Sequence, residues 1–549
     1  MAYNIPPEIS DYLGIVEQEK YPVCNEQKLL AAMIRGVFEN DDIYVDVNQL
    51  ARYMELQKFF PFDLYEWEKF CFSLHCCTYW SKTGLPRFPD LLLLVGRGAG
   101  KNGYLSFEDF CLLTVVNNIR GYNVDVVATT EDQAKTSFDE IREDVLDANK
   151  NYMSKYFAWT MEVIKNLKTN SKMRYYTNRA ESKDGLKPGI INFDEYHQYT
   201  NNKIIDVFTT ALGKKPHPRT TIATTDGKVR DGPLDDIKAT AVAILKGKQS
   251  DNGLLPFICR LDKEEDAKDP QLWVKANPSL PYNETLKNEI AKAWDNCQTN
   301  PQLYSEFMTK RMNLPIGNKD IEVTTWDNIL ATKGPVPDMK GCSCVAGIDF
   351  ARSDDFVAVG LLFKIEDTRY WITHTFVCRQ SKDLPRIKAP LDEWERAGLL
   401  SYINDVEIHP SVVAAWLADK ALDYNIIRLG IDQFRYSLMS NELEKLGFTA
   451  RGKDKNIILV RPSNQQYEEP VINSMFINRG IMWGDNPLMR WYTNNTKKAT
   501  SAHGNFSYEK IEEKSRKNDG FMALVSAKAA EGDLVSKREP PIVLGAFVF

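Results

Sequence analysis

The sequence lacks the features that mark membrane and secreted proteins. Its longest apolar stretches, such as residues 91–95, fall far short of the ~20 residues that cross a bilayer. No basic segment followed by an apolar one stands near Met1, so we expect no secretory signal and no membrane partner. The ten cysteines follow no repeated spacing, which argues against a disulfide framework and favours reduced thiols.

An excess of positive charge is also absent. The chain has 69 Lys and Arg residues against 75 Asp and Glu residues, a formal net charge of −6. This balance argues against a protein that coats nucleic acid without sequence preference. Hydrophobic residues make up 43% and charged residues 26% of the chain, which is typical of folded globular proteins.

The order of the predicted helices and strands differs between two parts of the 549-residue chain. From Phe88 to about Gly227, short apolar runs alternate with amphipathic stretches, which is typical of a parallel α/β sheet. From residue 341 onward, three consecutive strand candidates are followed by alternating helices and strands, the order of an RNase H-like domain. We therefore predict three parts: residues 1–255 with the parallel sheet and a helical N-terminal segment, a small helical linker or lid at 256–340, and an RNase H-like domain at 341–549.

A glycine-rich turn follows the first apolar run of the parallel sheet and precedes a helical pattern. Its residues are Gly96, Arg97, Gly98, Ala99, Gly100, Lys101 and Asn102. Such a turn presents backbone N–H groups and the positive end of a helix to phosphates, and its lysine can reach the β- and γ-phosphates of ATP. The strict pattern has glycine at position 95 and serine or threonine at 102, where this chain has valine and asparagine. The alternative is a structural turn with an exposed lysine.

Two later strand ends add polar groups to the same predicted sheet. The apolar run 190–193 ends in Asp194 and Glu195, and the run 220–223 ends in Thr224 and Thr225. In P-loop ATPases the first acid holds Mg²⁺ and its neighbour polarises the attacking water. We therefore predict a P-loop NTPase domain that binds ATP with Mg²⁺, with Asp194 at the metal and Glu195 as general base. The two threonines could sense the γ-phosphate, although each segment taken singly could be an ordinary strand end.

Three acids in the C-terminal half are predicted to converge. Asp349 lies in the first strand candidate of the RNase H-like segment, Asp432 ends a later strand, and Asp519 begins the last helix. An acid on an apolar strand is costly to bury unless it is paired or binds a metal. Three such carboxylates could bind two divalent cations that cleave a phosphodiester. Each acid could instead have a purely structural role, since Asp519 is a good helix N-cap and Asp432 could lie in a turn at the end of a strand.

The combination resembles the large subunit of tailed-bacteriophage terminases, the ATPase–nucleases that package viral DNA. The resemblance begins at about Pro61 and rests on the motifs VGRGAGKNG, VVATTEDQA, GIINFDE, TTIATTDG, GIDF, GIDQF and KNDGFMALVSAKAA. It implies that translocation of double-stranded DNA is driven by Arg97, Lys101, Asp194, Glu195, Thr224 and Thr225. It also implies that Asp349, Asp432 and Asp519 hold two nuclease cations, Mg²⁺ or Mn²⁺, that cut concatemeric genomes.

The same resemblance implies partners. These are a small terminase subunit, a portal protein, and further copies of the chain in a ring of usually five, all in the host cytoplasm. A neighbouring copy is expected to supply an arginine to the ATP site, and the candidates are Arg219, Arg230 and Arg260. Two rival hypotheses stay open: a P-loop helicase or repair nuclease, and a virion scaffold protein that binds nucleotide without turnover.

Overall fold

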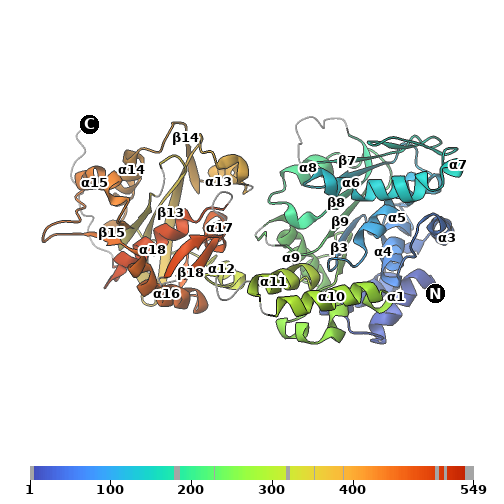
Figure 1. Cartoon of the computed structure of the whole chain (residues 1–549), viewed down its shortest axis with the longest axis horizontal. Coiled ribbons are helices and arrows are strands. Elements are labelled where there is room, and N and C mark those ends of the chain that lie inside the picture. Colours follow the sequence, from blue (N-terminus) through green and yellow to red (C-terminus); the bar gives the residue numbers. More distant parts are fainter. Residues whose placement is uncertain are drawn as a thin grey trace. The chain divides into compact units, whose positions relative to one another are not determined.

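The computed structural model describes residues 5–537 apart from 178–185, 228, 231, 299, 317–321, 351–352, 388, 501–505 and 512–515. The chain forms two compact units, Met1–Ile316 and Gly317–Phe549 (Figure 1). The border between them falls inside the segment 256–340 that the sequence analysis assigns to a linker, and the three-part division stays a prediction. None of the helices that the structure describes is long and apolar enough to span a membrane.

The first unit is built on an eight-stranded sheet with the order β10-β3-β9-β8-β4-β7-β6-β5. The strands that pair in parallel are β3 (Asp90–Leu94), β4 (Asn123–Val127), β7 (Lys172–Tyr176), β8 (Pro188–Asp194), β9 (Arg219–Thr224) and β10 (Leu254–Ile258). Two short strands, β5 (Phe157–Trp159) and β6 (Ile164–Asn166), extend the edge in antiparallel fashion. Every residue of β8 is buried, as expected for a strand covered on both faces.

Helices cover both faces of this sheet. One apolar core joins the sheet to α1 (Pro7–Glu17), α2 (Asn25–Asn40), α4 (Glu66–Cys77) and α5 (Lys101–Leu113). A second core lies on the opposite face, under α8 (Lys203–Thr209) and α9 (Pro233–Leu245). A smaller, separate apolar core holds together α10 (Glu284–Cys297) and the π-helix Phe307–Arg311. We call residues 284–316 the lid, because they lie in the segment predicted to be a linker or lid.

The second unit contains a seven-stranded sheet with the order β14-β13-β12-β11-β15-β16, to which β17 (Ile481–Met482) adds beside β13. The antiparallel part consists of β11 (Ser343–Asp349), β12 (Phe356–Ile365) and β13 (Thr368–Cys378). Parallel pairs then add β14 (Leu400–Ile403), β15 (Asn425–Asp432) and β16 (Ile457–Val460). Both sheets confirm the α/β fold class predicted from the sequence.

The last helix, α18 (Asp519–Glu531), crosses the middle of the second sheet. Gly347 of β11 and Gly430 of β15 pair in register and leave room for it. A Cβ on Gly430 would overlap the carbonyl oxygen of Ser526, and one on Gly347 would overlap that of Ala523. The helix therefore packs backbone to backbone on these strands, which fixes its N-terminal residue Asp519 near the ends of β11 and β15.

Replacing Gly430 with alanine will destabilise the second unit. The overlap is with helix backbone, which cannot turn aside as a flexible side chain does, so we expect a loss of about 1–3 kcal/mol. Urea unfolding monitored by tryptophan fluorescence measures it. Gly36→Ala in α2 is the matched control, because its Cβ would only touch Asn40 Nδ2 at 3.9 Å. Equal midpoints for Gly430→Ala and the unchanged protein would contradict this packing.

Candidate functional site

The glycine-rich turn lies between β3 and α5 in the first unit. Gly98 (φ 96°) and Gly100 (φ 108°) adopt left-handed backbone conformations that favour glycine. Lys101 is the first residue of α5, and the turn therefore ends at the N-terminus of a 13-residue helix. The first N–H groups of a helix have no partner within the helix, and together with the helix dipole they form an anion-binding site.

Lys101 meets both acids of the later strand end. Its Nζ donates to Asp194 Oδ1 at 2.9 Å and lies 2.7 Å from Glu195 Oε1. It also donates to Asn102 Oδ1 at 3.0 Å. Burial lowers the pKa of Lys101, but the charges of Asp194 and Glu195 outweigh it and raise that pKa. Burial dominates at Asp194 and raises the pKa of its carboxyl group.

Glu195 has an unusual backbone and an unusually acidic carboxyl group. Its φ of 48° is left-handed, which is rare for a residue other than glycine. Burial alone would raise the pKa of Glu195, but the hydrogen bond from His197 and the charge of Lys101 lower it to about 2. His197 Nδ1 lies 3.1 Å from Glu195 Oε2. The sequence analysis did not identify His197, and its position two residues after the acid was the available signal.

His197 also connects the acid to the predicted sensing segment. Its backbone N–H donates to Thr224 Oγ1 at 3.0 Å, and its ring nitrogen Nδ1 lies 3.2 Å from the same oxygen. The hydroxyl of Thr224 donates to the carbonyl of Thr225 at 2.7 Å. His197 and Thr224 thus join the segment that follows β8 to the end of β9.

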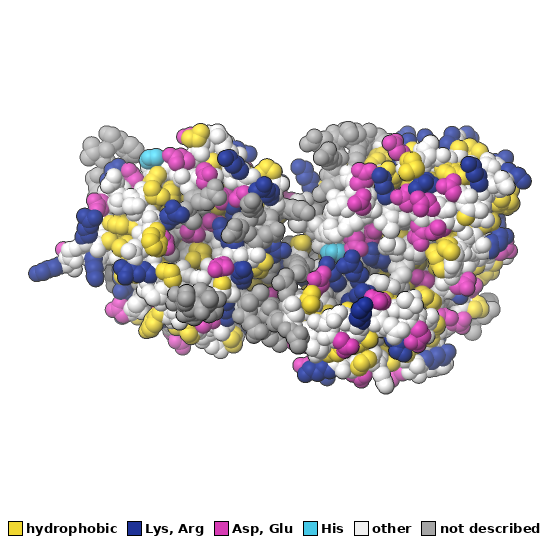
Figure 2. Space-filling view, in the orientation of Figure 1, with side chains coloured by type: hydrophobic (Ala, Val, Ile, Leu, Met, Phe, Trp, Pro, Cys, Tyr) yellow, Lys and Arg dark blue, Asp and Glu magenta, His cyan; other side chains and the backbone are white. Residues whose placement is uncertain are grey.

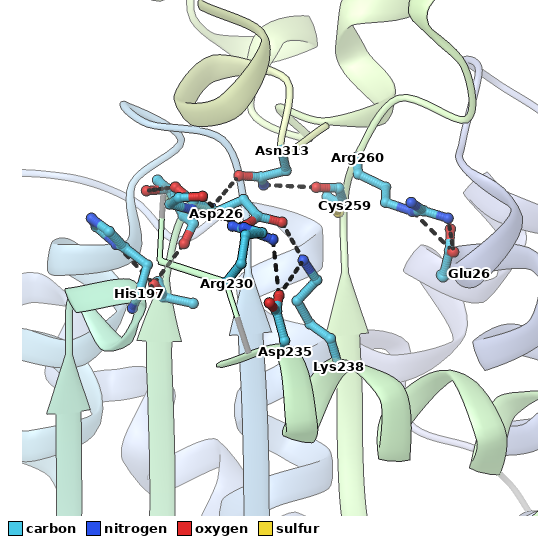
Figure 3. Close-up of polar contacts among 12 residues, drawn as sticks. Glu26, His197, Asp226, Arg230, Asp235, Lys238, Cys259, Arg260 and Asn313 are labelled. Carbon is cyan, nitrogen blue, oxygen red and sulfur yellow. Dashed lines mark hydrogen bonds and ion pairs between the residues drawn. The ribbon is translucent and has the colours of Figure 1, made fainter. Parts of the chain in front are cut away.

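The chain beyond β9 is held by charged and amide groups, and Figure 3 shows these contacts. The buried carboxylate of Asp226 accepts a hydrogen bond from Arg230 and pairs with Lys238. The Asp226 backbone N–H donates to Asn313 Oδ1 at 2.9 Å, and Asn313 Nδ2 donates to the carbonyl of Cys259 at 2.8 Å.

The three candidates for the one arginine expected to reach a neighbouring copy are all paired within the first unit. Arg219 is only 1% exposed and hydrogen-bonds inside the unit, so it cannot reach another copy. Arg230 pairs with Asp226 and Asp235, and Arg260 pairs with Glu26 (Figure 3).

The three acids of the second unit lie near the carboxyl ends of two inner strands of its sheet. Asp349 ends β11 and Asp432 ends β15, and the residues that precede them, Ile348 and Ile431, are paired. Asp519 is the first residue of α18. Burial and then the charge of Asp519 raise the pKa of Asp349 to about 8, and the charge of Asp432 acts in the same direction. The charges of Asp519 and Asp432 therefore both lie close enough to act on Asp349.

This cluster suits a divalent cation. Burial raises the pKa of Asp519, against the opposing charge of Lys510, whose Nζ is 4.0 Å away. Asp519 Oδ2 is buried and has no hydrogen-bond partner. Buried carboxylates that repel one another are stabilised by a cation, and oxygen donors suit Mg²⁺ or Mn²⁺. Among the residues that the structure describes, no group of three His, Cys, Asp or Glu side chains is placed as the ligands of one metal ion.

Two further charged residues lie beside this cluster. Lys517 is fully buried and donates to Asp383 Oδ2 at 2.8 Å and to Asp355 Oδ2. The charge of Asp355 raises the pKa of Asp519, while that of Lys517 lowers it. The sequence analysis did not assign either residue to the site, since both roles depend on the folded chain.

Comparison with known proteins gives matches over both units. A model described as the ATPase domain of the terminase large subunit matches residues 66–241, and one described as its endonuclease domain matches residues 248–409. Together they match more than half of the chain. Asp349 lies inside the second match, whereas Asp432 and Asp519 lie beyond it.

Individual relatives are distant. The terminase large subunit of Lactococcus phage SK1 is 23% identical over 447 residues, which cover 80% of this chain and 81% of that protein. Protein YmfN of Escherichia coli K12 is 23% identical over 365 residues, 63% of this chain and 77% of that protein. The crystal structure of the HK97 bacteriophage large terminase matches with 17% identity and a TM-score of 0.48, covering 89% of this chain and all of that one.

Proposed function

Because the chain belongs to the terminase large subunit family and carries both its ATPase and its endonuclease domain, we propose that it moves double-stranded viral DNA into procapsids and cuts concatemeric DNA. One observation supports the two activities most directly. The loop lysine of the first unit pairs with Asp194 and Glu195, while the second unit carries a separate cluster of carboxyl groups, of which that of Asp519 is buried.

In the ATPase unit, the first N–H groups of α5, at the end of the glycine-rich turn, and Lys101 bind the nucleotide phosphates. Asp194 and Asn102 are the residues that would hold Mg²⁺, and the ion would supply positive charge to neutralise the phosphates. When the phosphates draw Lys101 away from Glu195, the charge of Lys101 no longer lowers the pKa of that carboxyl group. Glu195 then becomes a stronger base, suited to orient and deprotonate the attacking water. His197 carries the change at Glu195 to Thr224 and Thr225.

In the nuclease unit, Asp349, Asp432 and Asp519 are the residues that would hold two divalent cations. When bound, such a pair activates water and stabilises the leaving oxygen of a phosphodiester. The buried, unpartnered oxygen of Asp519 supports this role. Lys517 donates to Asp355 and Asp383 beside the cluster, and its positive charge offsets the negative charge of their carboxylates.

The finer features of the family are part of the proposal. They are docking on a portal protein, site recognition by a small terminase subunit, a ring of five copies, and action in the host cytoplasm. The family membership disfavours both rival hypotheses, a helicase or repair nuclease and a scaffold protein without turnover.

A packaging assay tests the proposed function. Full-length protein, ATP, Mg²⁺, linear double-stranded DNA and procapsids with portals are mixed, and nuclease-resistant DNA is then measured. We expect ATP-dependent protection, increased by the small subunit for its own viral DNA. Strand separation on a forked duplex without protection would instead support the helicase, and the absence of ATP turnover would support the scaffold.

A further inference from the structure

The lid lies directly against the glycine-rich turn. The backbone N–H of Arg97 donates to the carbonyl of Lys310 at 2.8 Å, and Arg311 Nη1 donates to the carbonyl of Arg97 at 2.7 Å. A Cβ on Gly98 would lie 2.9 Å from Arg311 Nη1. The guanidinium of Arg311 therefore touches the turn at the glycines that are expected to face phosphates.

Two like charges meet at this place without a counter-charge in contact. Arg97 is exposed and Arg311 half-buried, and no acid of the described residues forms an ion pair with either. Burial and the charge of Arg97 lower the pKa of Arg311, while the more distant Glu289 acts in the opposite direction. Two guanidinium groups that repel each other beside an anion-binding turn are stabilised when an anion lies between them.

The same stretch of lid also touches the segment beyond β9. Asn313, two residues after Arg311, is 1% exposed and has a left-handed φ of 49°. Its side-chain amide bridges the backbone of Asp226 and Cys259, as Figure 3 shows. Lys310 to Asn313 thus contact both the turn and the chain that follows Thr224 and Thr225. A ligand held by Arg311 would also act on this second contact.

We propose that Arg311 is a second arginine of the nucleotide site, supplied by the lid of the same chain, and that with Arg97 it binds the polyphosphate of ATP. The inference rests on the proposed ATPase function. It makes the lid part of the binding site, so that nucleotide occupancy orders residues 310–313.

Binding of a fluorescent N-methylanthraniloyl-ATP to the full-length protein tests the inference. Arg311→Gln keeps an N–H donor for the carbonyl of Arg97 but has no positive charge, and we expect about 10- to 100-fold weaker binding. Arg311→Lys keeps the charge without the planar fork and is expected to fall between the two. Arg35→Ala is the control, because Arg35 pairs with Glu17 at an exposed site on the first unit. Thermal unfolding of each variant establishes that it is folded.

The outcomes separate the inference from the proposed function. Binding by Arg311→Gln within twofold of the unchanged protein would overturn the inference and assign Arg311 a structural hydrogen bond to the turn. Absence of ATP binding by the unchanged protein would overturn the ATPase function itself. In hydrogen exchange, we expect saturating ATP to protect residues 307–316 in the unchanged protein but not in Arg311→Gln. Equal protection in both would also contradict the inference.

Discussion

Replacing Asp349 with alanine will reduce metal-dependent DNA cleavage by about 100- to 1,000-fold while leaving ATP turnover within twofold. Asp349 ends β11, and the charges of Asp519 and Asp432 act on its carboxyl group, so its replacement would remove one of the proposed ligands of the cations. Nicking of a supercoiled plasmid by the full-length protein in Mn²⁺ measures the loss. The separate location of the ATP site in the other unit is the reason that turnover persists.

Stability distinguishes loss of a ligand from loss of the fold. Burial and then the charge of Asp519 raise the pKa of Asp349 to about 8, so the charged form of this carboxyl group does not stabilise the metal-free unit. We therefore expect the metal-free Asp349→Ala protein to unfold at the same temperature as the unchanged protein or above it. Asp367→Ala, at an exposed turn of the same unit, is the control and should keep full cleavage. Undiminished nicking by Asp349→Ala would remove this residue from the nuclease site.

Replacing Lys101 with alanine will lower ATP turnover by about 100- to 1,000-fold and leave ATP-independent nicking unchanged. The lysine is the group that reaches the phosphates, and its Nζ now lies within 3 Å of Asp194 and Glu195. Phosphate release in a steady-state assay measures the effect. Lys82→Ala, at an exposed turn of the same unit, is the matched control.

Loss of Lys101 also leaves the buried Asp194 without its cationic partner and leaves the half-buried Glu195 with His197 alone. We expect a destabilisation of the first unit of about 3–5 kcal/mol, the range for breaking a buried ion pair. Glu195→Gln separates chemistry from folding, because glutamine keeps the shape and can still contact Lys101. This variant should bind ATP and fail to hydrolyse it. Hydrolysis by Glu195→Gln at the unchanged rate would assign the general base elsewhere.

The sequence predicted those parts of the fold that depend on local patterns. The buried runs around residues 91–95, 124–128, 189–193 and 220–224 correspond to β3, β4, β8 and β9. The apolar spacing could not predict β14 and β17, which are short and pair with β13 from distant parts of the chain. The antiparallel hairpin of β18 (Thr496–Thr500) and β19 (Phe506–Lys510) was missed because its strands are polar.

The site residues also divide into those that local sequence patterns predict and those that depend on contacts in the folded chain. Lys101, Asp194 and Glu195 could be named because strand ends of a parallel sheet meet at one edge. His197, Asn313 and Arg311 could not, since their importance comes from contacts with residues that are far away in the sequence or from a left-handed backbone. Lys517 could not be named either, because its burial between Asp355 and Asp383 depends on the fold.

A crystal structure of the full-length protein soaked in Mn²⁺ tests the central claim most directly. The anomalous signal of manganese locates the cations independently of any assumption about their ligands. The account predicts manganese bound jointly by the carboxylates of Asp349, Asp432 and Asp519. Manganese bound elsewhere in the second unit, with these three carboxylates free of it, would contradict the account.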